Sequence, residues 1–325
     1  MGDLRIADRV EILVLVDNAT DSLSSTPEFV ESEFRRFWRR GGRVLSGQCL
    51  CCAAHGLSCA ITAWRGGIAR TLLFDTGPDV AVFERNVERL GFDMGTVDAI
   101  VLSHGHWDHG GAMLRALEMI QVRNGGHQVP TYMHPGMYRT RATRTPDGSM
   151  HLFDDIPSAA ALEAYGARVI HATDAQVILD DLFFISGEIP RVTKFETGLP
   201  NHYRRTEDCS GWELDPLITD ERFIAVGVKD KGVFVLTACS HAGVANVLTH
   251  ARGCFAGRPL HGVMGGFHLS GSAEKIIPDT VDALREFDLK SIVPAHCTGW
   301  RAIGALTSAF GQAVVPSAVG KTFRL

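Results

Sequence analysis

The fold of this chain is decided by one stretch, Ser103-His104-Gly105-His106-Trp107-Asp108-His109-Gly110-Gly111. An apolar run over 97–102, which reads as a buried strand, comes before it, and a helical pattern over 112–120 comes after it. Three His and one Asp therefore fall within six positions of a strand-to-helix loop. Imidazole nitrogen and carboxylate oxygen are the ligands of zinc and similar first-row metals. The stretch predicts that one loop supplies ligands to a metal site, with two neighbouring ions in reach.

The spacing within this stretch supports a metal site. The pattern His-x-His puts the side chains of His104 and His106 on the same side of an extended backbone. Asp108 and His109 then fall at the turn, where they can face a neighbouring point. The alternative is a surface loop that binds nothing, with Asp108 as a helix N-cap. Four ligand-type side chains at this density, between a buried strand and two Gly, favour the metal site.

Length and composition favour one large α/β domain. The chain has 325 residues, 45% of them hydrophobic, and can bury a sizeable core. We expect a single domain over 1–325, with irregular insertions near 18–48, 139–157 and 197–217. The first insertion is expected over the mouth of the site or at a subunit contact. The net charge is −5 and no basic block occurs, which argues against nucleic acid as a partner.

The sequence predicts neither a membrane span nor an export signal. No stretch approaches the ~20 apolar residues that cross a bilayer. The apolar run over 12–16 is short for a signal peptide, and acidic residues flank it. We therefore expect a cytoplasmic protein whose eight Cys stay reduced. The cluster Cys49, Cys51, Cys52 and Cys59 lacks Cys-x-x-Cys spacing, so buried thiols are favoured over a small metal site.

The rest of the pattern predicts alternating strands and helices. Gly66-Gly67 and Asp230-Lys231 are expected at the turns of two hairpins. Predicted strands cover 11–17, 59–64, 69–74, 131–133, 166–171, 176–185, 222–229, 232–238, 260–264, 291–294 and 321–324. Predicted helices cover 27–40, 80–90, 244–251, 272–287 and 299–310. Gly91 is expected to stop one helix and Pro278 to break another.

These motifs resemble those of a known family. His-x-His-x-Asp-His after a buried strand is the signature of the metallo-β-lactamase superfamily. The stretches 102–111, 238–243, 265–269 and 295–299 are similar to one branch, labelled 7,8-dihydropterin-6-methyl-4-(β-D-ribofuranosyl)aminobenzene-5′-phosphate synthase-like. The resemblance runs from about Val10 to the C-terminus. It implies the metallo-β-lactamase fold, an αββα sandwich of two mixed sheets with outer helices and metal ligands on loops at one edge.

The resemblance implies His104 and His106 as ligands of a first metal. In the superfamily the third ligand is the His of a Gly-His pair that ends a strand, but Glu188 follows Gly187 in this chain. Either Glu188 is a substitute ligand or His241 fills the place. We favour His241, because it lies just past a predicted strand end that must face the metals. Glu188 would then be an ordinary ion-pair partner.

The same resemblance implies Asp108, His109 and His296 as ligands of a second metal. Cys239 stands where the superfamily usually has an Asp that bridges both metals. A thiolate is a good zinc ligand, and a thiol beside metal cations loses its proton. The alternative is that Cys239 is a small buried residue. Asp75, in an Asp-Thr-Gly turn, either holds a ligand imidazole by its second N–H or is a plain turn carboxylate.

Three further residues are candidates for contact with a substrate. By resemblance, His55 is a pocket residue, and the alternative is a structural histidine. Arg204, in the irregular segment 197–217, either meets an anionic group bidentately or is only solvated. His268 follows two Gly, which let the backbone come close to a ligand. It is a candidate proton donor or substrate contact, with a structural hydrogen bond as the alternative.

We expect an enzyme that binds two divalent ions. Cys239 favours zinc, and fold relatives also use manganese and iron. Between two metals the pKa of a bound water falls to about 7. The resulting shared hydroxide would attack an ester, lactone or phosphoester of a small molecule. Asp108 would orient it, and His268 would protonate the leaving group. The alternatives are a pterin-pathway synthase, a mononuclear iron dioxygenase or a non-catalytic ligand-binding protein, and a homo-oligomer is open.

Overall fold

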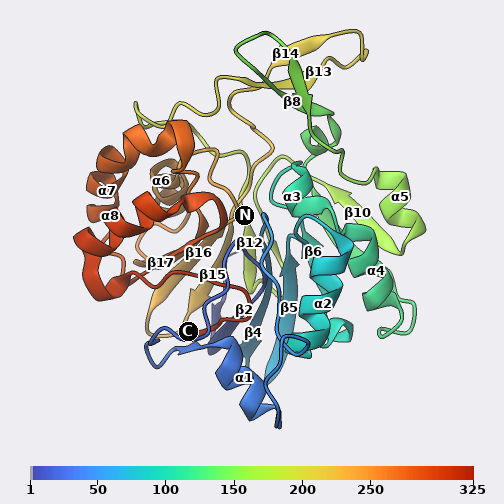
Figure 1. Ribbon diagram of the computed structural model, residues 1–325, viewed down its shortest axis with the longest axis vertical. Helices are drawn as coiled ribbons and strands as arrows, with labels where there is room; N and C mark the ends of the chain where they lie inside the picture. The colour runs from blue at the N-terminus through green and yellow to red at the C-terminus, as the bar shows by residue number, and fades with distance from the viewer. Residues whose placement is uncertain (1–2) are drawn as a thin grey trace.

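Two mixed β-sheets packed face to face form the centre of the protein, and helices cover both outer faces (Figure 1). This computed structural model describes residues 3–325. The αββα sandwich expected from the sequence is confirmed. The first sheet runs in the spatial order β10 (Ala167–His171), β7 (Val129–Met133), β6 (Ala99–Val101), β5 (Ile68–Phe74), β4 (Ser58–Arg65), β2 (Arg9–Val16), β19 (Thr322–Arg324) and β3 (Val30–Glu31).

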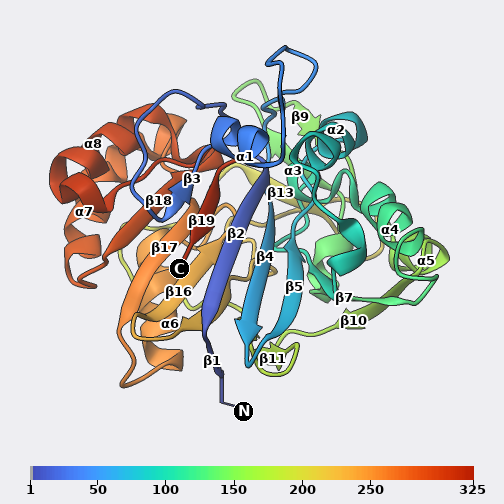
Figure 2. The same cartoon turned by 90° about the horizontal axis from the view of Figure 1, so that it is seen from below.

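The second sheet faces the first across the core. It runs in the order β11 (Gln176–Ile178), β12 (Phe183–Ile185), β15 (Ile224–Val228), β16 (Gly232–Thr237), β17 (Leu260–Gly266) and β18 (Ser291–Ala295), and β1 (Ile6–Ala7) pairs with β15. Seen from below, the C-terminal strand β19 lies between β2 and β3 in the first sheet (Figure 2). Strands from both ends of the chain thus close this edge of the sandwich.

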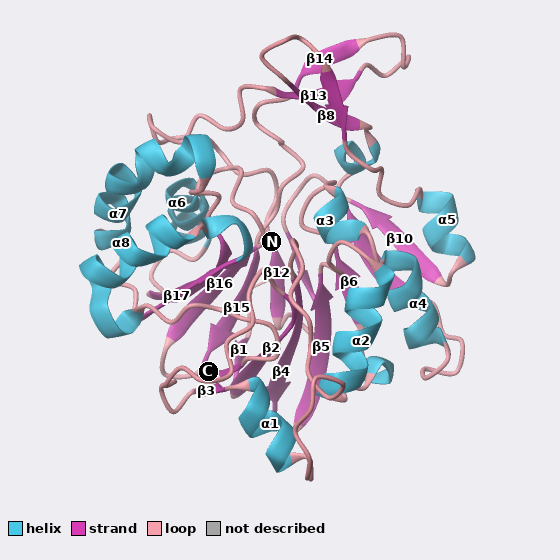
Figure 3. Ribbon diagram, viewed as in Figure 1, coloured by secondary structure: helices cyan, strands magenta, loops and turns pink. Residues whose placement is uncertain are grey.

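The helices form the two outer layers (Figure 3). The second sheet is covered by α6 (Val244–Cys254), α7 (Ile277–Arg285) and α8 (Trp300–Phe310). The first sheet is covered by α2 (Val80–Leu90), α4 (Met113–Gln121) and α5 (Ala159–Ala164). The remaining helices are α1 (Glu33–Arg39) and the short α3 (Trp107–Gly110). None of the helices in residues 3–325 has the length and apolar character that crossing a membrane requires.

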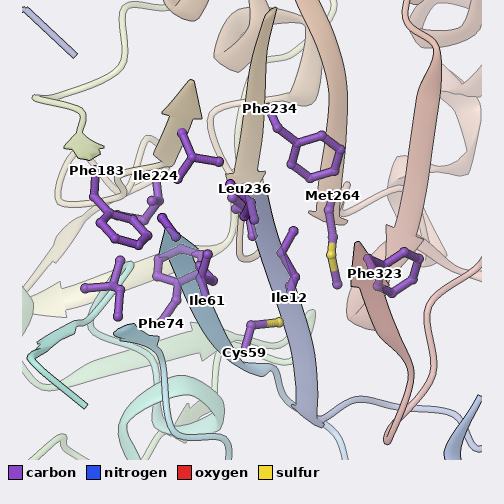
Figure 4. Packing of buried hydrophobic residues seen from close by; sticks show 14 of the residues in the cluster. Ile12, Cys59, Ile61, Phe74, Phe183, Ile224, Phe234, Leu236, Met264 and Phe323 are labelled. Atoms are coloured by element: carbon purple, nitrogen blue, oxygen red, sulfur yellow. The ribbon is translucent and has the colours of Figure 1, made fainter. Parts of the chain in front are cut away.

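The core between the sheets explains why they stay together. Ile12, Ile61 and Phe74 of the first sheet pack against Phe234 and Leu236 of the second (Figure 4). All five side chains are buried. Burial of one such side chain stabilises the fold by ~1.5–3 kcal/mol before entropy is counted. This apolar layer supplies the rigid base from which the site loops project.

Strand direction brings the site loops to one edge. In the first sheet β5, β6 and β7 are parallel neighbours. In the second sheet β16, β17 and β18 are parallel neighbours. Carboxyl ends of parallel neighbours meet at the same sheet edge, where ligands bind in open α/β sheets. Loops that are distant in sequence therefore converge there.

A small sheet projects beyond this edge, at the top of Figure 1. It runs in the order β14 (Trp212–Leu214), β13 (His202–Arg205), β8 (Arg141–Arg144) and β9 (Met150–Leu152), and we call it the cap sheet. It is built from the segments 139–157 and 197–217, which were expected to be irregular. These strands lack apolar alternation, so the sequence pattern does not predict strands there.

Three predicted elements differ from the structure. The helix expected over 27–40 begins only at Glu33, because Val30–Glu31 pairs with β19 and Ser32 caps the helix. The strand expected over 176–185 is interrupted, because Leu179, Asp180 and Asp181 turn the chain with φ of 53°, 58° and 62°. The helix expected over 272–287 begins as a 3₁₀ turn and becomes α7 only at Ile277, one residue before Pro278.

The segment 18–48 was expected over the mouth of the site or at a subunit contact, and the subunit contact stays a prediction. It does not line the pocket described below. Its helix α1 packs beside α2, where Arg36 Nε donates to the Leu90 carbonyl at 3.1 Å. Of the four clustered thiols, Cys51 and Cys59 are buried and Cys49 and Cys52 half-buried.

Candidate metal centre

Loops from both sheets meet in one pocket of about 500 Å³. The metal loop (residues 103–111) follows β6, and the loops after β16, β17 and β18 lie opposite it. Trp107, Phe153 and Leu199 contribute apolar walls. The other lining side chains include several of ligand type: His55, His106, Asp108, His202, Cys239, His241, His268, His296 and Cys297.

The first group of ligand atoms is the three-histidine cluster, His104, His106 and His241. His104 Nε2 lies 3.0 Å from His106 Nδ1 and 3.1 Å from His241 Nε2. Nitrogens bound 2.0–2.1 Å from one ion at ~90–110° to each other lie ~2.9–3.4 Å apart. The observed separations fall in that range. The cluster therefore has the spacing of three ligands of one cation, with His241 rather than Glu188 as the third.

The second group is the Asp108 cluster, Asp108, His109 and His296. Asp108 Oδ2 lies 3.3 Å from His296 Nε2 and 3.7 Å from His109 Nε2. His55 Nε2 approaches the same oxygen at 3.4 Å. Asp108 lies inside the first turn of α3 and His106 occupies the N-cap position, so Asp108 is not the N-cap.

Cys239 lies between the two clusters. Its Sγ atom lies within 4.8 Å of one ring nitrogen of His104 and one of His109. Cys239 Sγ lies 3.4 Å from His268 Nδ1 and 3.0 Å from Cys297 Sγ. Cys239 is thus placed near both groups, at the position where the superfamily usually has an Asp.

Partners outside the clusters fix which nitrogen of two metal-loop histidines faces inward. His109 Nδ1 lies 2.7 Å from Asp75 Oδ2, a carboxylate that can only accept, so Nδ1 carries the proton. Ser103 Oγ donates to Asp75 Oδ2 at 2.8 Å and therefore accepts from His104 Nδ1 at 2.9 Å. The lone pair of His104 Nε2, and that of His109 Nε2 when its ring is neutral, are left to face the clusters.

His202 and Asp215 likewise fix which nitrogen of His106 faces the cluster. His202 Nδ1 lies 2.9 Å from the Asp215 carbonyl, which only accepts, so His202 is protonated at Nδ1. Its Nε2 then accepts from His106 Nε2 at 2.9 Å. His106 is left with its lone pair on Nδ1, the atom that faces His104. Burial lowers the pKa of His202 to about 4, so its ring stays neutral.

Asn18 sets the tautomers of His296 and His55. The Gly56 N–H donates to Asn18 Oδ1 at 3.0 Å, which fixes the orientation of the amide. His296 Nδ1 then donates to the same oxygen at 2.8 Å, so its lone pair is on Nε2. Asn18 Nδ2 donates to His55 Nδ1 at 3.1 Å, so His55 presents an N–H at Nε2.

Two of the inward nitrogens, both in the Asp108 cluster, lack a hydrogen-bond partner in the part of the chain that the structure describes. His109 Nε2 and His296 Nε2 are buried without a hydrogen-bond partner among residues 3–325. A buried polar atom left unpaired costs ~1–3 kcal/mol. A cation at each cluster would satisfy these lone pairs, and the nitrogen, carboxylate and thiol donors suit zinc and similar metals. The residues present therefore fit bound metal ions.

Comparison with known proteins agrees with this geometry. Residues 70–214 match the family model described as the beta-lactamase superfamily domain. The fold is that of the metallo-β-lactamase superfamily. A solved structure of Tm1679, described as a metal-dependent hydrolase of the beta-lactamase superfamily, superimposes with a TM-score of 0.70 at 21% identity. That match covers 97% of this chain and 98% of the other.

Two curated proteins from Methanocaldococcus jannaschii are similar in sequence. The first is named 7,8-dihydropterin-6-methyl-4-(beta-D-ribofuranosyl)-aminobenzene-5'-phosphate synthase, with 27% identity over 76% of this chain and 82% of its own length. The second is the uncharacterized protein MJ0448, with 26% identity over 78% of this chain and 88% of its own length. Both alignments span most of each chain.

Burial and neighbouring charged groups together set the protonation states of the histidines in the site. Burial lowers the pKa of His104, His106 and His241 well below the ordinary value, and neighbouring histidines lower it further. These rings are neutral near pH 7, the form that binds a metal. Burial opposes charge on His109 too, but Asp108 and Asp75 raise its pKa to about 9. Metal binding at neutral pH would therefore release the His109 proton.

Two candidate residues do not reach the pocket. The side chain of Glu188 is 52% exposed, and its Oε1 lies 3.3 Å from His134 Nε2. Arg204 pairs with Glu213 at 2.8 Å and lies 3.8 Å from Asp215. Glu188 thus contacts His134 at the surface, away from the metal loop, and Arg204 is held within the cap sheet. Both side chains are engaged by nearby charged groups that the sequence spacing did not predict.

Sequence reasoning missed two residues that hold ligands in place. His202 belongs to the cap sheet and is fully buried, although its sequence surroundings are polar. Asn18 follows the first long strand, where Asp17-Asn18 reads as an ordinary turn. The signal for Asn18 was its position at the carboxyl end of a core strand. For His202 no signal existed, because it reaches His106 only through the pairing of β13 with β8.

A buried ion pair joins the cap sheet to the metal loop. Asp220 Oδ1 bonds the Arg141 guanidinium at 2.5 Å, and its Oδ2 accepts from the Gly105 N–H at 2.9 Å. A Cβ at Gly105 would lie 2.2 Å from the Met137 carbonyl, so only Gly fits there. The aromatic ring of Phe153 packs edge-on against His106, with centroids 5.4 Å apart. The cap sheet therefore contacts the metal loop directly.

Proposed function

We propose that this protein is a metal-dependent hydrolase that cleaves an ester, lactone or phosphoester in a small molecule. The observation that carries the proposal is the inward orientation of four histidine lone pairs, each fixed by a partner outside the clusters. This orientation would be costly in a protein that bound no cation. Similarity to the beta-lactamase superfamily domain, and to a solved structure described as a metal-dependent hydrolase, supports the same proposal.

The two clusters would hold two neighbouring cations. His104, His106 and His241 would bind one, and Asp108, His109 and His296 the other, with Cys239 between them. When bound, such a pair lowers the pKa of water to about 7 and polarises the oxygen of the group under attack. Zinc is the cation that best suits the mixed nitrogen, oxygen and sulfur donors, with manganese and iron as alternatives.

Two histidines without a ligand role would handle protons and orientation. His55 presents its Nε2–H toward the pocket, because Asn18 occupies its other nitrogen. It would donate a hydrogen bond to a substrate oxygen beside Asp108. His268 lines the opposite side of the pocket and would protonate the leaving group. Asp108, as a ligand, would also orient the attacking group.

The pocket walls indicate the kind of substrate. Trp107 and Phe153 offer aromatic surface, and Arg144 lies at the same wall. An apolar or aromatic portion would pack on the rings, while Arg144 would pair with an anionic substituent. The volume of about 500 Å³ suits a small molecule rather than a polymer.

The test uses metal-stripped protein to which zinc or manganese is returned. A panel of chromogenic esters, lactones and phosphodiesters is assayed with each metal. We expect turnover that requires metal and that His106→Ala abolishes. His127→Ala, at an exposed histidine outside the pocket, serves as the control and should retain full activity. Turnover that survives both chelation and His106→Ala would overturn the proposal.

A synthase activity is the second candidate. It is favoured by similarity over 76% of this chain to a protein named as a pterin-pathway phosphate synthase. In that case the site would join two molecules rather than use water. Mass spectrometry of products separates the two. Incorporation of oxygen from isotopically labelled water indicates hydrolysis, and a product heavier than either organic substrate indicates condensation.

A further inference from the structure

A sulfur-rich side of the pocket is not explained by the ligand set above. The neighbouring parallel strands β16, β17 and β18 end close to Cys239, His268 and Cys297. One ligand atom of each of these three residues lies within 4.8 Å of the others. Cys297 follows the ligand-type His296 directly, and neither the motif comparison nor the proposed mechanism gives it a role.

The two cysteines are in unusually close contact. Their Sγ atoms lie 3.0 Å apart, well inside an ordinary nonbonded separation of ~3.5–4.0 Å, yet both are free thiols. They are 3% and 7% exposed, and both line the pocket. A buried thiol in an apolar core needs no such neighbour. The contact brings two sulfur donors to one point on the pocket floor.

The surrounding backbone is shaped to allow this contact. A Cβ at Gly266 would lie 2.6 Å from Cys297 Sγ, so only Gly leaves room for that sulfur. Thr298 Oγ1 accepts from the Phe267 N–H at 3.0 Å and donates to the Ala295 carbonyl at 2.8 Å, which ties the two loops together. His268 has a φ of 46°, a strained conformation that is found most often at functional sites.

We propose that Cys297 is a second sulfur ligand of the metal centre, paired with Cys239, so that this side of the site selects a thiophilic cation such as zinc or cadmium. Thiolates favour zinc and related soft cations, whereas manganese and magnesium favour oxygen donors. The inference rests on the metal centre but not on hydrolysis. Metal ligation can be measured without a substrate, so the inference can hold in a protein that turns over none of the tested substrates.

The first experiment loads metal-free protein with cobalt(II), a spectroscopic substitute for zinc. Sulfur ligation gives a thiolate-to-cobalt charge-transfer band in the near ultraviolet. We expect this band in the wild type, a fall to about half in Cys297→Ser because one of two sulfur ligands remains, and its loss when Cys239→Ser is added. Cys254→Ser, at an exposed thiol on α6, is the matched control and should leave the band unchanged.

A second experiment uses the wild type alone and so does not depend on how the variants fold. Alkylation of each cysteine by iodoacetamide is followed by mass spectrometry, with and without zinc. Zinc at 100 times its dissociation constant should slow modification of both Cys239 and Cys297 by about 100-fold, and manganese should protect them far less.

Several results would overturn the inference. One is a wild-type protein that binds cobalt without the charge-transfer band. Another is a band of full strength in Cys297→Ser, or modification of Cys297 at the same rate with zinc as without. Recovery of Cys239 and Cys297 as a disulfide from protein purified without reductant would also contradict it, because the pair would then be a redox couple.

Discussion

The two halves of the site are built in different ways. The half that follows the first sheet is one contiguous loop, and Asp75 and Ser103, from the same sheet, hold its histidines. The half that follows the second sheet takes side chains from three separate strand ends: Cys239 and His241 after β16, His268 after β17 and His296 after β18. The first half has nitrogen and oxygen donors alone, while the second adds sulfur.

We infer from this difference that the two halves of the site have different roles. The metal loop is held by buried partners whose hydrogen bonds are satisfied, so it presents a preorganised nitrogen and carboxylate set. The second half and the cap sheet complete that set and line most of the pocket. We infer that the metal loop supplies the ligands that bind metal in general. The second half and the cap sheet determine which cation and which substrate are accepted.

Asp75→Asn should break the first half most strongly. The carboxylate accepts from His109 Nδ1, Ser103 Oγ and the Ser103 N–H, and it is fully buried. Loss of a buried charged partner costs about 3–5 kcal/mol. We expect a loss of this size in urea unfolding of the metal-free protein, together with loss of bound metal. Asp282→Asn, at an exposed site, is the control, and equal stability of the two variants would contradict the assigned role.

Asp220→Asn tests the link between the cap sheet and the metal loop. Burial opposes the charge, but Arg141 holds the pKa of Asp220 below its ordinary value of 3.8. A lowered pKa means stability that is present above that value and lost as pH falls through the folded-state pKa. The variant should be less stable by about 2–3 kcal/mol near pH 7, with a gap that shrinks below about pH 4. A gap that does not change with pH would contradict the charged role.

His202→Ala should weaken metal binding more than folding. The ring holds His106 by one hydrogen bond from outside the cluster, and loss of such partners costs 10–100-fold in metal affinity. Zinc competition with a chelator measures the effect. His202→Gln keeps a side-chain acceptor and should recover part of the affinity. An alanine variant with wild-type zinc affinity would show that the cap sheet does not position the ligand.

Arg204→Ala should have the smallest effect. Its ion pairs lie within the cap sheet and are partly exposed, so the loss should stay below about 1 kcal/mol. Arg144→Ala is the matched comparison, because Arg144 lines the pocket and Arg204 does not. We expect KM for an anionic substrate to rise in the Arg144 variant alone. If KM rises in the Arg204 variant instead, Arg204 contacts the substrate and its assignment to the cap sheet alone is wrong.

The sequence predicted the parts of the site that lie close together in the chain. His104, His106, Asp108 and His109 could be recognised because their spacing and the flanking strand and helix are local features. The choice of His241 over Glu188 also followed from strand ends. The geometry agrees with it, since His241 Nε2 lies 3.1 Å from His104 Nε2.

The remaining parts depend on contacts that spacing does not encode. His202 reaches His106 only because β13 pairs with β8, two strands without apolar alternation. Asn18 acts on His296, which lies at the opposite end of the chain. The contact between Cys239 and Cys297 needs the space that Gly266 leaves. Each depends on tertiary packing, which overrides local pattern.

Metal content per chain tests the central claim most directly. Elemental analysis of protein purified without added metal, and again after zinc loading, is compared for the wild type, His241→Ala and the control His127→Ala. The two clusters predict two zinc ions per chain in the wild type and the control, and one in His241→Ala. A folded wild type that binds no zinc, or a His241→Ala variant that keeps both ions, would contradict a two-metal centre.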